Sequence, residues 1–300
     1  MIRFISGILI LSSIASGQED LLSELGDVPQ RLNPVIATFK ATRIVNAQSV
    51  ELTHPKTMEF MIQHRFGSIT NGVYDLFGMD GAVIRFDLKY GLNDRFSFGG
   101  GRSSLNKVYD LFSKIKILKQ IDGTPFYPIS VVLFGKIEMD TQDKFSADAE
   151  EFINRITYDF QVLAARKMNE SFSIQLMPTW VHRNFVLSDR LEHDLISLGA
   201  GGRVKVTKRV SVNADTFFPL GDRNPNFVQS WGLGCDIETG GHVFQLMITN
   251  VQGAYESSYV ENATGKFENN DLYLGFNIKS LFSLDRNDLL IRLEKIYNTA

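Results

Sequence analysis

Hydrophobic and polar positions alternate with a period of two from Met58 onward. In residues 83–90 (VIRFDLKY), the apolar side chains Ile84, Phe86 and Leu88 share one face, and the charged side chains take the other. Such alternation is typical of strands whose two faces meet different surroundings. We predict twelve strands, at residues 58–67, 82–90, 95–102, 107–120, 126–137, 151–166, 171–183, 193–206, 210–219, 227–238, 242–250 and 271–279.

The connectors between these strands are of two kinds. After even-numbered strands they are short and rich in turn-forming Asn, Asp and Gly, including one at residues 121–125. After odd-numbered strands they are mostly long and polar, as at 138–150 and 251–270, with 103–106 as the exception. Outer-membrane barrels have short periplasmic turns and long extracellular loops, whereas a soluble sandwich has no reason to separate its connectors. The pattern therefore predicts an all-β fold, a transmembrane antiparallel up-and-down β-barrel of about 12 strands.

The two faces then acquire different roles. The outward face of a barrel in lipid must be apolar, while its interior is free to hold water. The segment lengths also suit tilted transmembrane strands, which need about 9–11 residues. His64 is the exception on an apolar face, which predicts a bulge or a place near the lipid headgroups. We expect the charged residues of the polar faces to line the lumen: Arg65, Arg85, Asp87, Lys89, Arg95, Lys114, Lys116, Lys136, Arg155, Asp159, Arg183, Arg203, Lys205, Asp215, Asp236 and Glu238.

The two ends of the chain lie outside the alternating pattern. Arg3, the apolar residues 4–15 and the small residues 15–17 predict a signal peptide over residues 1–17, so that the protein is exported. Residues 18–57 are expected to form a periplasmic N-terminal segment or a plug. The barrel is expected over residues 58–280, followed by a periplasmic C-terminal tail at 281–300.

Composition narrows the classes of function. A net charge of −3 and a pI near 6.0 give no electrostatic reason to expect nucleic-acid binding. The single cysteine, Cys235, excludes an internal disulfide, and the five histidines show no metal-ligand spacing, so we expect no cofactor or metal. The sequence also lacks the common hydrolase, zinc-protease and phosphate-loop motifs. We read His193 beside Asp194 as a solvated loop edge, and Gly99, Gly100 and Gly101 as positions for close packing or bending.

Several short motifs resemble one known family. They are residues 37–46 (ATFKATRIVN), 62–67 (IQHRFG), 77–80 (FGMD), 90–95 (YGLNDR) and 99–103 (GGGRS). The chain resembles an uncharacterised β-barrel family of Gram-negative outer membranes, a domain of unknown function, over most of its mature length. The resemblance implies a fold and a location in the outer membrane. It brings no substrate and no catalytic or binding residues.

Three classes of function remain open. A narrow porin-like channel for small polar solutes fits a 12-strand barrel, and the excess of Arg and Lys among the expected lumen residues favours anionic or zwitterionic solutes. The same charges could instead pair across the lumen and close it. A non-conducting barrel could dock a periplasmic protein partner, and a barrel-embedded enzyme is the least favoured class. Outer-membrane lipid surrounds the protein in every case.

Overall fold

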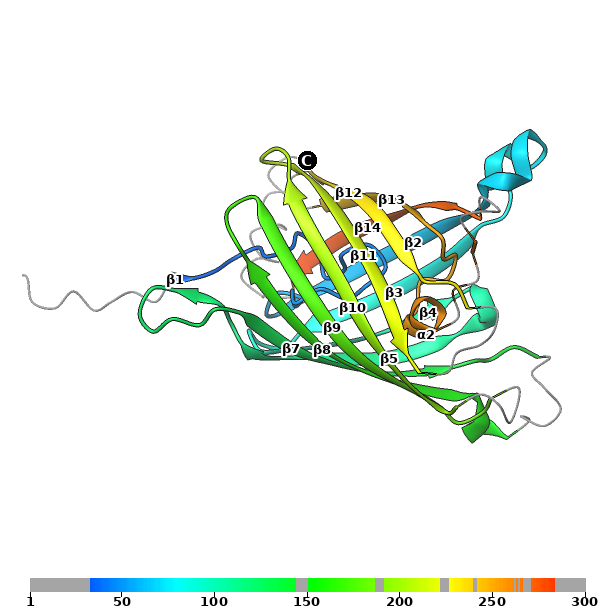
Figure 1. Cartoon of the computed structure of the whole chain (residues 1–300), viewed down its shortest axis with the longest axis horizontal. Helices are drawn as coiled ribbons and strands as arrows, with labels where there is room; N and C mark the ends of the chain where they lie inside the picture. Colours follow the sequence, from blue (N-terminus) through cyan, green and yellow to red (C-terminus); the bar gives the residue numbers. More distant parts are fainter. Residues whose placement is uncertain are drawn as a thin grey trace, which may run out of the picture.

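Twelve antiparallel strands close into a barrel in the computed structural model, which describes residues 33–143, 151–186, 192–221, 227–239, 242–261, 263, 265–266 and 271–283 (Figure 1). Barrel strands that follow one another in the chain also pair with one another in the ring, and the last strand pairs with the first. The predicted twelve-strand fold is confirmed. In ring order the strands are β2 (Thr57–Ser68), β3 (Val83–Gly91), β4 (Phe96–Ser103), β5 (Tyr109–Leu118), β7 (Ser130–Met139), β8 (Ile156–Lys167), β9 (Phe172–Arg183), β10 (Asp194–Lys205), β11 (Val210–Leu220), β12 (Trp231–Thr239), β13 (His242–Thr249) and β14 (Tyr273–Ser283).

Short turns gather at one end of the barrel and long connections at the other. The long-connection end carries η1 (Ile69–Gly78), η2 (Leu105–Lys107), η4 (Phe152–Arg155) and the short helix α2 (Glu256–Val260). One turn at the other end is longer than predicted, because residues 119–129 separate β5 from β7. There β6 (Ile121–Asp122) pairs with β1 (Asn33–Pro34) outside the ring, and this pairing explains the extra length.

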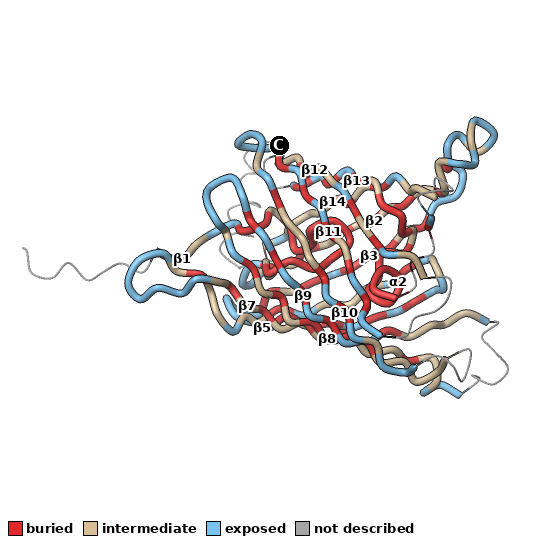
Figure 2. Tube along the Cα trace, viewed as in Figure 1, coloured by how far each residue is buried: buried red, intermediate tan, exposed pale blue. Residues whose placement is uncertain are grey.

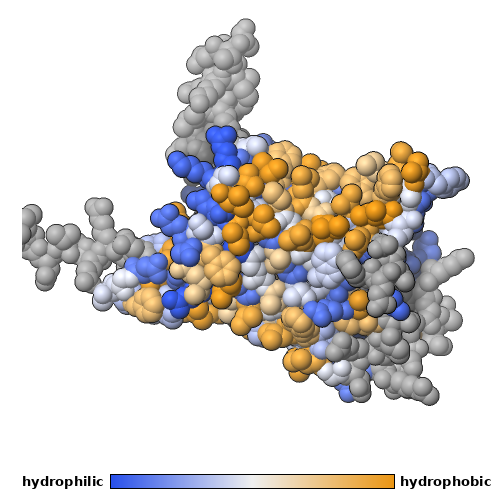
Figure 3. Space-filling model, turned by 45° about the horizontal axis from the view of Figure 1, so that its top comes forward, coloured by the Kyte–Doolittle hydropathy of each residue, from blue (hydrophilic) through white to orange (hydrophobic). Residues whose placement is uncertain are grey.

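The two faces of the wall differ as the alternation predicts. In β3, the side chains of Arg85 and Asp87 are buried inside the barrel, whereas Phe86 and Leu88 are each 45% exposed on the outside. The same alternation of buried and more exposed positions runs along the other strands (Figure 2). Apolar side chains accordingly cover much of the visible outer wall (Figure 3). Because this outer face is apolar, it is suited to contact with lipid rather than with water.

The predicted irregularity at His64 is present. The register between β2 and β14 shifts next to this residue, between the pairs Tyr273–Ser68 and Gly275–Arg65. The His64 ring stacks on Phe276, with ring centroids 4.8 Å apart, and also contacts Phe66 at 4.5 Å. An aromatic cluster at a bulge therefore accommodates the imidazole on the outer face.

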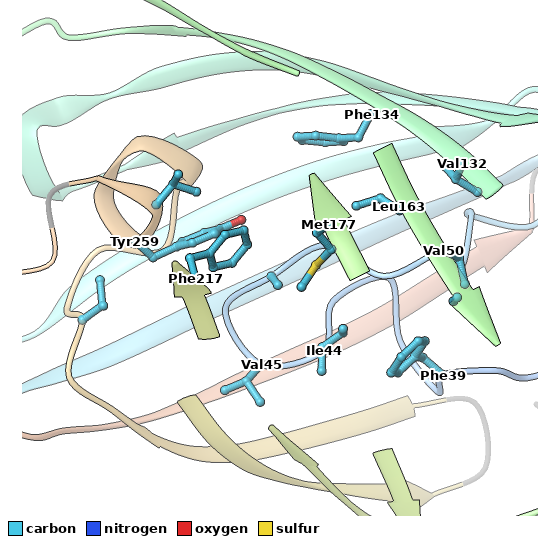
Figure 4. Packing of buried hydrophobic residues seen from close by; sticks show 14 of the residues in the cluster. Phe39, Ile44, Val45, Val50, Val132, Phe134, Leu163, Met177, Phe217 and Tyr259 are labelled. Carbon is cyan, nitrogen blue, oxygen red and sulfur yellow. The ribbon is translucent and has the colours of Figure 1, made fainter. Parts of the chain in front are cut away.

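The hydrophobic core of the protein lies inside the barrel. Phe39, Ile44, Val45 and Val50, from the segment before β2, are almost completely buried. They pack against inward-facing side chains of the wall, and the cover over them includes Tyr259 of α2 (Figure 4). The wall contributes Val132, Phe134, Leu163, Met177 and Phe217. A segment that precedes the barrel in sequence thus fills the middle of its lumen.

We expect a charged side chain on the outer face to destabilise the barrel more the closer it lies to the middle of the bilayer. Leu246 lies in the middle of β13 and is 52% exposed to the outside. Leu246→Arg should reduce the free energy of unfolding by about 2–4 kcal/mol, because arginine is poorly solvated at the bilayer midplane. The control Leu220→Arg, at the end of β11, should cost only about 0–1 kcal/mol. Reversible urea unfolding from lipid vesicles measures both, and equal small costs would contradict a lipid-facing wall.

Candidate functional site: the interior of the barrel

The inserted segment makes a tight hairpin, here called the inner hairpin (residues 42–49). The backbone N–H of Ser49 donates to the carbonyl of Thr42, and that of Ile44 donates to Ala47. Arg43 and Gln48 form the isolated bridge between the two arms. Glycines of the wall make room for this hairpin. A Cβ atom added at Gly201 would lie 2.7 Å from Cδ1 of Ile44, so a larger residue there would push against the hairpin.

Asp215 of β11 holds the tip of the inner hairpin. Its Oδ2 accepts hydrogen bonds from three successive backbone N–H groups, those of Val45, Asn46 and Ala47, at 2.9, 2.9 and 2.8 Å. Hydrogen bonds to an ionised acceptor are stronger than those between neutral groups. Asn46 also donates from its side chain to Oγ1 of Thr249. The tip is therefore tied to the wall by contacts that depend on one carboxylate.

The two ends of the inner hairpin, near Thr42 and Ser49, are hydrogen-bonded to other parts of the wall. Nζ of Lys114 donates to the backbone carbonyls of Thr42 and Ser49 at 2.9 and 2.8 Å. Gln175 accepts from the backbone N–H of Val50 and donates to the carbonyl of Gln48. These side chains satisfy backbone groups that a short hairpin leaves unpaired in a buried place.

A second inserted piece covers the hairpin from the long-loop end; we call it the cover segment (residues 250–261). Its α2 residue Glu256 accepts from Nη2 of Arg43 at 3.2 Å and Nε2 of Gln48 at 2.8 Å, both on the hairpin. Glu256 also forms an ion pair with Lys136 of β7. Burial alone would raise the pKa of Glu256, but the charges of Lys136, Arg43 and Arg85 outweigh it and hold that pKa below its ordinary value. Glu256 is thus an ionised link between hairpin, cover and wall.

Two wall residues fix the backbone and the end of the cover segment. Glu138 accepts from the backbone N–H of Glu256 at 3.0 Å and from the hydroxyl of Ser257 at 2.5 Å. Nε of Arg183 donates to Glu261 at 2.5 Å. Burial raises the pKa of Glu261 above its ordinary value, and Arg183 offsets this only in part.

Four further charges of the β2–β7 arc form ion pairs with one another. Arg85 forms an ion pair with Asp110, and Lys89 pairs with Glu59 at 2.8 Å. A Cβ atom at Gly101 would lie 2.5 Å from Nη2 of Arg85, so this glycine provides the space for the guanidinium. Both ion pairs join residues on the same side of the wall rather than across the lumen.

The structure places the sixteen residues that the sequence singled out in three kinds of position. Ten are buried on the inner side of the wall: Arg65, Arg85, Asp87, Lys89, Lys114, Lys136, Asp159, Arg203, Asp215 and Asp236. Arg203 lies near the short-turn end, where it donates to the carbonyls of Ala37 and Thr38. Others are only half-buried, toward the strand ends: Lys116, Arg183, Lys205 and Glu238. Two lie elsewhere. Arg95 is exposed in the turn before β4, and Arg155 belongs to η4 at the long-loop mouth, so the expectation that strand faces carry them into the lumen is corrected.

Sequence reasoning missed several interior charges. Glu59, Asp110 and Glu138 are buried on inner faces, and their positions follow the same period of two as Arg65, Lys114 and Lys136. The signal was therefore present for these three. Arg43 and Glu256 lie outside the strands, and no periodicity marks them. All three missed strand residues are acidic, so the buried interior has no clear excess of positive charge.

Two cavities lie on opposite sides of the inserted pieces. The larger, of about 590 Å³, opens at the long-loop end and is lined by residues that include Arg155, Arg183, Asp140 and Glu261. The other, of about 430 Å³, lies toward the short turns beside Lys40, Glu59 and Lys279. They share no lining residue. The inner hairpin and the cover segment stand between them.

The histidines that the sequence analysis considered lie outside the barrel interior or at its rim. His182 and Asp194 meet on the outer face, with Nδ1 and Oδ1 2.9 Å apart, and Trp180 donates to the same oxygen. His193 binds the carbonyl of Arg183 instead. In the described ranges no group of three or more His, Cys, Asp or Glu residues is placed to hold a metal ion. No helix in the part of the chain described is long and apolar enough to cross a membrane.

Comparison with known families agrees with this architecture. Residues 39–282 match the model of a family described as a membrane bound beta barrel domain (DUF5777). The chain belongs to this family. The match includes the inner hairpin as well as all twelve strands, so the membrane bound beta barrel domain comprises wall and insertion together. The predicted resemblance and the location in a membrane are confirmed.

Solved structures similar to this membrane bound beta barrel domain include an outer membrane channel and two porins. An outer membrane channel from Pseudomonas putida F1 has 13% identity over 81% of this chain and 100% of its own, with a TM-score of 0.48. The NanC porin has 11% identity over 75% and 98%, with a TM-score of 0.45. The KdgM porin, solved with disordered oligogalacturonate, has 7% identity over 76% and 99%, with a TM-score of 0.44. No curated protein matches the sequence.

Proposed function

We propose that this barrel is an outer-membrane channel for small polar solutes, closed at rest by the inner hairpin and the cover segment. One observation supports this most directly. The two cavities face opposite mouths, and the inner hairpin and the cover segment lie between them, packed against inward-facing side chains of the wall. Neither insertion belongs to the ring of strands, so displacing them need not break any strand pairing of the wall.

The chemistry of the wall also supports passage of polar solutes. Its inner face carries buried charges and amides rather than a continuous apolar surface. Several of these polar atoms lack a hydrogen-bond partner within the protein, among them Gln161 Oε1 and Nε2, Ser197 Oγ and Ser211 Oγ. Buried polar groups in such positions are normally hydrated. A polar and hydrated wall suits solutes that carry their own polar groups.

The same contacts also suit a second function. Apolar packing and the Asp215 carboxylate hold the hairpin firmly, as a barrel that stays closed and docks a periplasmic protein would require. The two functions differ in whether the hairpin ever moves.

A reversible crosslink tests this difference. A Cβ atom at Gly234 would contact Cγ2 of Val45 at 3.2 Å, so cysteine side chains at these two positions would be direct neighbours. Val45→Cys with Gly234→Cys, in a Cys235→Ser background, should therefore lock the hairpin to β12 when oxidised. In planar bilayers the reduced protein should show opening events, and oxidation should suppress them by about tenfold or more.

The single variant Val45→Cys, in the same Cys235→Ser background, is the control, and its conductance should not change on oxidation or on reduction. Conductance that is equal in the oxidised and reduced double variant would show that the hairpin does not gate the pore. Silence of the folded protein under both conditions would favour the closed docking barrel.

A further inference from the structure

Two buried ionisable side chains, one basic and one acidic, have several polar atoms without a hydrogen-bond partner. Asp159 is 2% exposed, and neither of its carboxylate oxygens has a hydrogen-bond partner. Arg65 is fully buried, and its Nε and Nη2 are unpartnered, while Nη1 donates to the amide oxygen of Asn277 and to a carbonyl. Every other buried acid in the described ranges accepts at least one hydrogen bond. Unpaired buried charges are costly, so their presence calls for a reason.

The positions of these two residues are related by the barrel. Arg65 lies three residues from the long-loop end of β2, and Asp159 lies three residues from the long-loop end of β8. In the ring, β2 and β8 are five strands apart one way and seven the other. Both side chains face inward. The two residues therefore lie on well-separated walls, each in the long-loop half of its strand.

The cover segment lies over both places. Nε2 of Gln252 donates to the carbonyl of Phe66, next to Arg65. Helix α2 packs against β8 and β11. When the cover segment and the hairpin move aside, as the proposed function requires, Arg65 and Asp159 would face each other across the opened lumen.

We propose that Arg65 and Asp159 form the two poles of a binding site for zwitterionic solutes, small molecules that carry both an ammonium group and a carboxylate. This inference rests on the proposed channel function and names its solute class. The free edge of a guanidinium is suited to a carboxylate, and the unpartnered oxygens of Asp159 are suited to an ammonium. A simple anion would satisfy Arg65 alone and leave Asp159 unpaired. A zwitterion supplies both counter-charges and is itself neutral overall.

The test compares four solutes of nearly equal size with the full-length protein in proteoliposomes. They are glycylglycine, which is zwitterionic, its N-acetylated anion, its C-terminally amidated cation, and the doubly capped neutral form. The wild-type barrel should pass glycylglycine fastest, by about tenfold over the neutral form. Arg65→Gln should remove most of this preference and slow the anion, and Asp159→Asn should do the same and slow the cation.

Asp236→Asn is the matched control, because Asp236 is buried on another part of the wall and already accepts from Gln245. It should leave the order of the four solutes unchanged. A second readout is independent of transport: glycylglycine should raise the unfolding temperature of the wild-type protein in detergent, but not that of Arg65→Gln or Asp159→Asn.

The outcomes separate the two proposals. Passage of all four solutes at similar rates, unchanged in both variants, would overturn the zwitterion site and leave the channel standing. Binding of glycylglycine that depends on Arg65 and Asp159, without passage of any solute, would support the site and overturn the channel. Neither binding nor passage would overturn both.

Discussion

Replacing Asp215 with alanine should free the inner hairpin and open the pore far more often than in the wild-type protein. Three backbone N–H groups at the tip donate to this one carboxylate, and alanine leaves all three without an acceptor. Hydrogen bonds to charged groups contribute about 1.5–3 kcal/mol each, so a net loss of about 3 kcal/mol is a conservative expectation. A loss of that size shifts the ratio of open to closed barrels by about a hundredfold.

Single-channel recording in planar bilayers measures this shift directly as the open fraction. Asp215→Asn keeps one oxygen as an acceptor and should fall between alanine and wild type. Ser211→Ala is the control on the same strand, since Ser211 is buried on the inner face but its hydroxyl has no partner. An open fraction for Asp215→Ala equal to that of the control would mean that the tip contacts do not keep the pore closed.

Removing the carboxylate of Glu256 should produce the largest loss of stability that a single interior substitution causes. Arg43 would lose its ion pair, and Lys136 would keep only Asp110 and Glu138. Breaking a buried ion pair by removing one partner costs about 3–5 kcal/mol, because the other charge stays buried without compensation. Glu256→Ala should therefore lower the free energy of unfolding by that amount in urea titrations from lipid vesicles.

Two further variants show whether the cost comes from the stranded charge. Adding Arg43→Met to Glu256→Ala should recover part of the loss, and the double-mutant cycle gives the coupling between the two residues. Glu238→Ala removes a carboxylate that is 37% exposed and pairs with Lys40, so it should change stability little. A Glu256→Ala cost as small as that of Glu238→Ala would contradict the role of Glu256 as a link.

The depressed pKa of Glu256 sets the pH dependence of this contribution. The folded protein keeps the carboxylate ionised below its ordinary pKa of 4.5, so the stabilisation is fully present above that value. It is lost as the pH falls further, toward the lower pKa of the folded state. The difference between wild type and Glu256→Ala should consequently shrink in strong acid.

The period-two pattern was sufficient to predict the strands of the wall, because it depends only on residues that are neighbours in the sequence. A strand sends successive side chains to opposite faces, and a lipid exterior demands apolar residues on one of them. Residues such as Phe86 and Asp87 could therefore be assigned to faces from their order alone. The 121–125 turn was less predictable, because its length depends on the pairing of β6 with the distant β1.

The interior follows a different logic. Period two identified Arg85 and Lys136 as inward-facing but could not say which acids they would meet, and Glu256 is 120 residues away from Lys136. The partners of Arg43 and Asp215 lie still further along the chain. Such contacts exist only after the ring closes and two segments from outside the strands enter it.

Taken alone, the sequence determined the number of strands, the lipid-facing side of each and the location in a membrane, because alternation acts over neighbouring residues. The tertiary structure alone decided that the hairpin at residues 42–49 fills the lumen, and that most interior charges are paired. It also decided that Nε and Nη2 of Arg65 and both carboxylate oxygens of Asp159 have no hydrogen-bond partner. Those outcomes depend on which distant residues the closed barrel brings within hydrogen-bonding distance, and no local pattern specifies that.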